Sequence, residues 1–213
     1  ESFKKSFFEG LAFLRERKFL IILFSYLALI NFVVHGSVLV GLPILVKEHM
    51  GATPQLYGSL MTVCGLGALF AFGSAKLVPS IPLEKYFTIL ALIDLVTAGL
   101  IYSFVSVEFG WLSFVILFSI GFIGGLIQLN TFSLLQTKVE ERFRGRMISF
   151  FMFSVFGLIP ISSSITGWVI SVTGVIGAFK FMAVLLALAA VFFLLITSKY
   201  KTSLTLQQDQ VSG

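Results

Sequence analysis

Residues 19–46 read FLIILFSYLALINFVVHGSVLVGLPILV, a stretch without a single Asp, Glu, Lys or Arg. About 20 mostly apolar residues in a helix suffice to cross the hydrocarbon core of a bilayer, so this stretch predicts a transmembrane helix. Five further apolar stretches follow along the chain, at residues 57–75, 86–107, 111–136, 147–172 and 177–198. The sequence therefore predicts an all-α membrane protein with six transmembrane helices.

The composition excludes the soluble classes of protein. Of the 213 residues, 57% are hydrophobic and only 12% are charged, against about 45–50% and about 25% in ordinary globular domains. A soluble enzyme, a disordered chain and a coiled coil are excluded on this ground. The single cysteine, Cys64, and two histidines without metal-binding spacing predict neither a disulfide nor a metal site, and we expect no cofactor and no enzyme activity.

The ends of the chain differ from its middle. Residues 1–18 place apolar side chains three and four positions apart, with lysines and arginines between them, which predicts an amphipathic linker helix on the membrane surface. Residues 19–198 form the six-helix transmembrane domain, and residues 199–213 form a polar cytoplasmic tail that we expect to be loose. Because the chain begins at Glu1 and not at Met, we expect it to be a fragment or a processed piece.

The basic residues indicate how the bundle is oriented. If the N-terminus is cytoplasmic, 13 of the 15 Lys and Arg residues fall in cytoplasmic segments, and only Lys47 and Lys180 lie outside. Cytoplasmic segments of membrane proteins carry an excess of Lys and Arg. We therefore expect a multi-pass protein with both termini in the cytoplasm. Topology also explains the net charge of +5, so we expect the lipid bilayer and no nucleic acid as a partner.

Small residues recur at helical spacing in two of the predicted spans. Gly67, Ala71 and Ala75 follow one another at steps of four in the second span, and Gly121 and Gly125 share a face of the fourth. In lipid, small residues at this spacing let helix backbones approach closely. A dinucleotide-binding loop would need a preceding strand and a later acid, which this chain lacks. We therefore interpret the small residues of the second span as a helix-packing stripe.

Four polar side chains inside the predicted spans are candidates for the lining of a solute pathway. Asn31 and His35 lie four residues apart in the first span, and Gln128 and Asn130 lie on neighbouring faces of the fourth. Polar groups deep in lipid usually face the bundle interior or a water-filled cavity. The alternative is that they only hydrogen-bond between helices. Since a histidine titrates near neutrality, His35 is also a candidate for a proton role, unless it lies near the outer surface.

Asp94 lies about nine residues into the third predicted span, near its middle. An ionised carboxylate at the centre of a membrane-spanning helix costs about 2.5–3.5 kcal/mol, and no basic residue lies deep in a span to offset it. Asp94 is therefore either a proton-coupling residue or a neutral acid fixed by packing. In the fifth span, Pro160 removes a backbone donor and predicts a kink, which suits a rocking helix but also occurs in static bundles.

Several segments resemble the major facilitator superfamily. Residues 9–14 (EGLAFL) are similar to the central cytoplasmic linker that leads into helix seven, and residues 65–68 (GLGA) fit the next helix. The most specific segment is 135–149, in which LQTKV leads to RGRMIS. It resembles the loop between helices ten and eleven of bacterial macrolide-efflux-like exporters. The resemblance marks four residues as structural or conformational: Arg144, Gly145, Arg146 and Pro160.

A complete member of this superfamily has twelve helices in two six-helix halves around a central cavity. The resemblance implies that this chain is the C-terminal half, built from two inverted three-helix repeats over about 19–107 and 111–198, and that an N-terminal half is missing. It also implies a proton-coupled antiporter of the bacterial plasma membrane that exports small amphipathic or drug-like molecules by alternating access. A self-contained six-helix scaffold or assembly protein without transport activity is the alternative.

Overall fold

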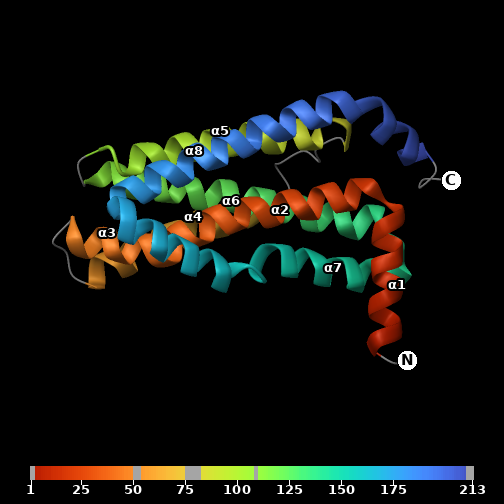
Figure 1. The fold of residues 1–213 in the computed structure, drawn as a ribbon, viewed down its shortest axis with the longest axis horizontal. Helices are drawn as coiled ribbons and strands as arrows, with labels where there is room; N and C mark the ends of the chain where they lie inside the picture. The colour runs from red at the N-terminus through yellow and green to blue at the C-terminus, as the bar shows by residue number, and fades with distance from the viewer. Residues whose placement is uncertain (1–2, 50–53, 75–82, 108–109, 210–213) are drawn as a thin grey trace.

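The computed structural model describes residues 3–49, 54–74, 83–107 and 110–209, and within these ranges every regular element is a helix. Figure 1 shows long helices lying side by side along the long axis of the molecule, with one helix across the end. The elements in chain order are α1 (Phe3–Glu16), α2 (Lys18–Gly36), the π-helix η1 (Ser37–Gly41), α3 (Leu42–Glu48), α4 (Pro54–Gly73), α5 (Leu83–Phe104), α6 (Trp111–Lys138), α7 (Glu141–Phe156) and α8 (Ile159–Asp209).

The described residues contain five stretches that are long and apolar enough to cross a membrane: Lys18–Glu48, Pro54–Gly73, Lys85–Phe104, Trp111–Lys138 and Glu141–Ile196. Helices are the expected form, because a helix pairs its backbone polar groups internally where no water is present. The first four stretches fall on the first four predicted spans. The fifth, of 56 residues, would extend about 84 Å as one straight helix, against a hydrocarbon core of about 30 Å.

The stretch Glu141–Ile196 is not one straight helix, because the chain reverses its direction at Gly174. It has φ 73° and ψ 166°, the one non-helical conformation inside α8. A positive φ costs glycine little because it has no Cβ. Figure 1 shows the arm before Gly174 running toward the α3 end of the bundle and the arm after it running back. Gly174 lies between the apolar stretches 147–172 and 177–198, so the sequences predicted as fifth and sixth spans lie on the two sides of this turn.

The first membrane-spanning stretch continues through a π-helical turn. Pro43 has no backbone N–H, so it cannot bond to the carbonyl group that a regular α-helix would pair with it. The preceding turn widens, and the backbone N–H of Leu42 donates to the carbonyl oxygen of Ser37, five residues back. This local change keeps α2, η1 and α3 in one helix from Lys18 to Glu48. Nothing in the apolar pattern of the sequence predicts it.

Close backbone contact joins α4 to α6, which pack on each other more extensively than any other two elements of the described chain. A Cβ added to Gly121 would overlap the backbone carbonyl of Cys64, and one added to Gly67 would overlap that of Phe118. A Cβ on Gly125 would lie 2.9 Å from the Cα of Ala68. The helix-packing role predicted for the small residues is therefore confirmed for the described ones; Ala75 lies outside the described residues.

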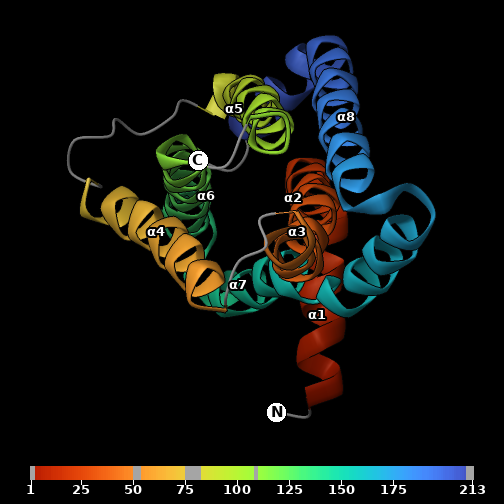
Figure 2. The same cartoon turned by 90° about the vertical axis from the view of Figure 1, so that its left-hand side faces the viewer.

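The remaining helices pack around α2. Figure 2, viewed along the bundle, shows α4 and α6 on one side, α5 and α8 on another, and α2 toward the middle. α5 packs mainly on α8, and α2 contacts both α7 and α8. The largest fully buried side chains of this core include Leu23, Tyr26, Tyr86, Leu135, Phe151 and Leu186.

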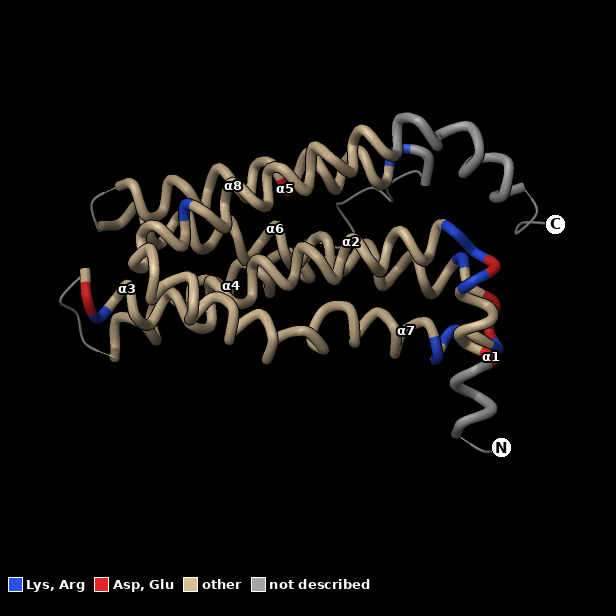
Figure 3. Tube along the Cα trace, in the orientation of Figure 1, with Lys and Arg blue, Asp and Glu red and all other residues tan. Residues whose placement is uncertain are grey.

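The chain ends lie at one end of the bundle. α1 covers most of the predicted linker helix and crosses the bundle at the end where α8 finishes (Figure 1). Figure 3 shows that charged residues gather at the two ends of the bundle, most of them around α1. α8 is helical through Asp209, so it extends into the predicted polar tail, and the looseness of that tail stays a prediction. Consecutive helical backbone bonds extend into the polar sequence there.

The α4–α6 contact can be tested with two neighbouring glycines of the same helix. Gly121→Ala should lower the free energy of unfolding by about 1–3 kcal/mol, because the new methyl group must push α4 away. Gly124→Ala is the matched control, since a Cβ at Gly124 meets nothing within 4 Å and alanine is the better helix former. Thermal unfolding in detergent measures both; equal stability of the two variants would contradict the close contact.

Candidate functional site

A buried acid pairs with a buried phenol at the centre of the bundle. Asp94 lies midway along α5, and the hydroxyl group of Tyr26 on α2 donates a hydrogen bond to its Oδ2 atom. Each side chain is only 1% exposed. The ring of Phe193 from α8 lies 4.2 Å from the ring of Tyr26. Three helices thus meet around this hydrogen bond.

No ion pair to Asp94 is found among the described residues. Burying a carboxylate without a cationic partner is costly, so this environment favours the uncharged acid, which can both donate and accept a hydrogen bond. The structure therefore supplies a packing partner for Asp94, and it brings neither His35 nor a basic residue into ion-pair contact with it within the described ranges. Whether Asp94 exchanges a proton during function stays a prediction.

Asn31 and His35 share one face of α2. The side-chain amide of Asn31 donates to the carbonyl oxygen of Leu27 in its own helix, at 2.8 Å. The ring of His35 lies 6.0 Å from that of Phe156, the last residue of α7. Its Nε2 atom is buried and lacks a hydrogen-bond partner in the described part of the chain. On this face of α2, the amide of Asn31 is hydrogen-bonded within its own helix, while the Nε2 atom of His35 can form a hydrogen bond with a further group.

Gln128 and Asn130 lie on α6, away from that face. Asn130 donates to the carbonyl oxygen of Leu126, at 2.9 Å, so it too satisfies its own helix. Helical spacing places Gln128 on the side of α6 that carries Gly121 and contacts α4. No hydrogen bond joins these side chains to Asn31 or His35 across the described ranges, and α2 does not pack extensively on α6. The proposed lining by all four side chains stays a prediction.

Cross-helix hydrogen bonds reveal polar residues that the sequence interpretation missed. Tyr86 on α5 lies 2.7 Å from Thr131 Oγ1 on α6, and the Ser162 hydroxyl on α8 donates to the carbonyl oxygen of Phe32 on α2. Tyr26 could have been noticed, because it lies inside a span and not at the membrane interface where tyrosines gather. Its partner could not have been, since the rotation of each helix about its axis is not local information.

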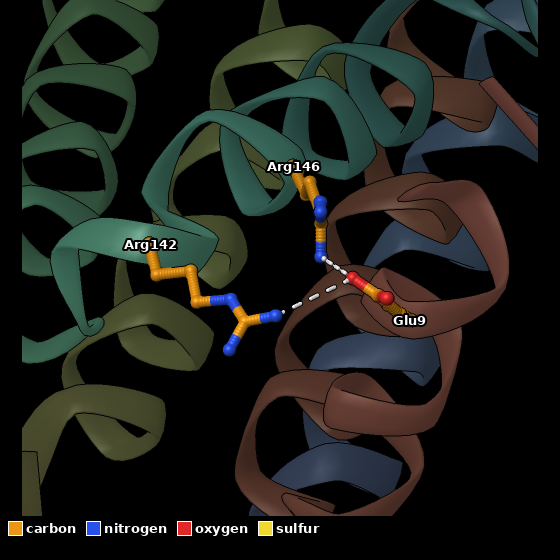
Figure 4. A network of polar contacts seen from close by, with 3 residues as sticks. All are labelled: Glu9, Arg142 and Arg146. Atoms are coloured by element: carbon orange, nitrogen blue, oxygen red, sulfur yellow. Dashed lines mark hydrogen bonds and ion pairs between the residues drawn. The ribbon is translucent and has the colours of Figure 1, made fainter. Parts of the chain in front are cut away.

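The Arg144-Gly145-Arg146 segment is helical. The resemblance places it in a loop, but the structure has it in the first turns of α7, after a connection of only two residues from α6. Figure 4 shows Arg146 directed at Glu9 of α1, with Nη1 2.9 Å from Oε2, and Arg142 approaching the same carboxylate. A Cβ added to Gly145 would meet nothing within 4 Å. Of the three residues, Arg146 has the defined contact to another helix.

Pro160 is the second residue of α8 and is exposed. The helical ladder stops between Phe156 and Ile159, so the predicted interruption of the fifth span is present as a break between α7 and α8. The hydroxyl group of Ser164 donates to the carbonyl oxygen of Pro160, at 2.9 Å. The break divides the fifth predicted span into two helical pieces.

The hydrogen bond between Tyr26 and Asp94 predicts an asymmetric response to conservative variants. Tyr26→Phe leaves a buried carboxyl group without its partner and should destabilise the protein by about 1–3 kcal/mol. Asp94→Asn should cost less, because an amide can still accept the phenol hydrogen bond. Tyr102→Phe is the control, since Tyr102 is 46% exposed near the end of α5. Thermal unfolding that ranks Tyr26→Phe with Tyr102→Phe would show that the bond contributes nothing.

Comparison with known proteins assigns the chain to a family. Searches against curated proteins and against solved structures each gave no significant match. A family model described as transmembrane secretion effector, of the major facilitator superfamily, matches residues 1–210. That match covers nearly the whole chain, including α1 and both arms of α8. The chain therefore belongs to the transmembrane secretion effector family of the major facilitator superfamily.

Proposed function

We propose that the chain is the C-terminal half of a secondary active transporter that exports small amphipathic or drug-like molecules in exchange for protons. The observation that carries this proposal is membership of a transporter superfamily over residues 1–210, on an all-helical bundle with several membrane-spanning stretches. No covalent chemistry is required. Transport follows from alternating exposure of one binding cavity to the two sides of the membrane, with an N-terminal six-helix half supplying the other wall.

The proposed orientation puts the α1 end of the bundle in the cytoplasm of a bacterial cell. Charged residues concentrate at that end (Figure 3), and the basic ones come from the ends of α1 and α6 and from the starts of α2, α5 and α7. The positive-inside tendency supports this choice. Both chain ends then lie on the cytoplasmic side, and the Gly174 turn lies on the outer side.

The first and fourth predicted spans, α2 and α6, are the proposed cavity walls. On α2, the unpartnered Nε2 atom of His35 offers a hydrogen bond to a polar atom of the transported molecule. Gln128 and Asn130 offer amide groups from α6. We propose that the two triplets of spans, about 19–107 and 111–198, are inverted repeats that rock against the second half.

Asp94 fits a structural role better than a proton-carrying one in this proposal. Its Oδ2 atom accepts from Tyr26, and its side chain is 1% exposed at a junction of three helices. A proton carrier must reach water in at least one state, and this would require α2, α5 and α8 to separate. We propose that Asp94 keeps its proton and that His35 is the titrating group of this half.

Transport itself is tested with the complete protein encoded by the reading frame that contains residues 1–213, reconstituted in proteoliposomes. With a pH gradient imposed, a fluorescent amphipathic cation should accumulate against its own gradient, and a protonophore should abolish the accumulation. Vesicles that hold residues 1–213 alone should show none, because half of the cavity wall is absent. Equal behaviour of protein-containing and empty vesicles would favour the alternative of a membrane scaffold.

Coupling is tested by comparing Asp94→Asn with His35→Gln in the same vesicles. Asp94→Asn should leave the pH dependence of uphill transport unchanged. His35→Gln should abolish uphill transport while downhill exchange survives, because glutamine does not titrate near neutrality and so removes the proposed proton site. If Asp94→Asn instead abolishes uphill transport and spares exchange, Asp94 is the proton carrier and the structural assignment is wrong.

A further inference from the structure

The linker helix α1 is seated on the start of α7 by an aromatic contact. The rings of Phe13 and Phe143 stack with their centroids 4.2 Å apart and their planes within 19°. Phe13 is 6% exposed, although it lies in a helix at the end of the bundle. A Cβ added to Gly10 would lie 3.3 Å from the Cβ of Arg146, so the backbone of α1 comes close to α7 at this point. α1 is therefore docked on α7 and not merely adjacent to it.

One carboxylate of α1 faces two arginines of α7 (Figure 4). Glu9 Oε2 lies 2.9 Å from Arg146 Nη1 and 3.9 Å from Arg142 Nη2. The Arg146 side chain is 21% exposed and the Arg142 side chain 71% exposed. Arg146 thus binds the carboxylate of Glu9 through a half-buried hydrogen bond, while the Arg142 side chain lies beside the same carboxylate and is exposed to solvent.

The two arginines are geometrically alike. They lie four residues apart, which places them on one face of α7 and about 6 Å apart along its axis. Both guanidinium groups lie over the ring of Phe143, at 5.6 Å for Arg142 and 5.4 Å for Arg146. The same ring that stacks on Phe13 therefore orients both cations toward the carboxylate of Glu9.

A second ion pair of opposite polarity fixes the direction of α1. Arg17, just after α1, lies 2.7 Å from Glu140, just before α7. Its guanidinium group also lies 4.3 Å from the centre of the Phe13 ring. At one end of the contact an acid of α1 meets a base of α7, and at the other end a base after α1 meets an acid before α7. If α1 ran in the opposite direction, like charges would face each other.

We propose that α1 is a latch with two seats on α7, in which Glu9 is held by Arg146 in the arrangement seen here and by Arg142 when α1 shifts. The shift is small, because Arg142 already lies 3.9 Å from the same oxygen atom. The rings of Phe13 and Phe143 stay in contact during this small shift, while the charged partners exchange. The linker helix α1 precedes the first span, and α7 forms the start of the fifth predicted span. The latch therefore links the position of α1 to the tilt of the fifth span. This proposal does not depend on which molecule is transported.

The latch is tested by pulsed electron spin resonance on the full chain in lipid nanodiscs. Spin labels are placed at Ala12 and Ser149, both exposed, after the single cysteine is replaced by Cys64→Ser. The unaltered contact should give a narrow distance distribution. Glu9→Gln should shift the ratio of docked to undocked molecules about fivefold toward the undocked, broad component, as expected for a half-buried ion pair. Glu16→Gln, which neutralises an exposed acid of the same helix, is the matched control.

The two seats are distinguished by single and double arginine variants. Arg146→Gln and Arg142→Gln should each keep the narrow component, because the other arginine takes the carboxylate, while the double variant should broaden the distribution as Glu9→Gln does. If Arg146→Gln alone equals the double variant, the second seat does not exist. The charge swap Glu9→Arg with Arg146→Glu should restore docking that Glu9→Arg alone destroys. Equal distributions for Glu9→Gln and Glu16→Gln would overturn the latch. None of these outcomes depends on transport.

Discussion

The hydrocarbon core of a bilayer offers no water to a polar group, and this constraint organises the molecule. Every described span is helical because a helix satisfies its own backbone. The amides of Asn31 and Asn130 bond back to carbonyl groups one turn earlier in their own helices. A hydroxyl or carboxyl group that reaches another helix instead forms a cross-helix bond, as between Tyr26 and Asp94. Each such bond joins two particular helices.

Apolar surface does not by itself hold these helices together, because lipid tails are as apolar as leucine. Close backbone packing does this between α4 and α6, where Gly121 and Gly67 leave no room for a methyl group. Gly36 has the same role between α2 and α8, since a Cβ there would overlap Thr166 and the Ser162 hydroxyl. Glycine contacts and cross-helix hydrogen bonds together decide which helices pack on each other.

The contacts at the α1 end of the bundle are more exposed to solvent than those of the core. At α1 and the start of α7, side chains are partly exposed, so ion pairs there are weaker than the contacts of the core and exchange partners more readily. Inside the bundle, separating Tyr26 from Asp94 leaves both groups without water. A transporter requires parts that stay rigid and parts that rearrange. In this chain the rigid contacts lie within the membrane-spanning region, and the exchangeable ones lie around Glu9 at its edge.

The sequence by itself determined the membrane class, the approximate ends of the spans, the connection between the fifth and sixth spans and the packing role of Gly67. These follow from local properties: the length of the apolar stretches and the spacing of small residues. The facing of each helix was decided only by the tertiary structure. Spans that are apolar on all sides have no polar face to reveal their rotation, so neither the pairing of Tyr26 with Asp94 nor the separation of His35 from Gln128 was visible. The helical start of α7 was equally hidden, because its charged residues resemble a loop until α1 packs against them.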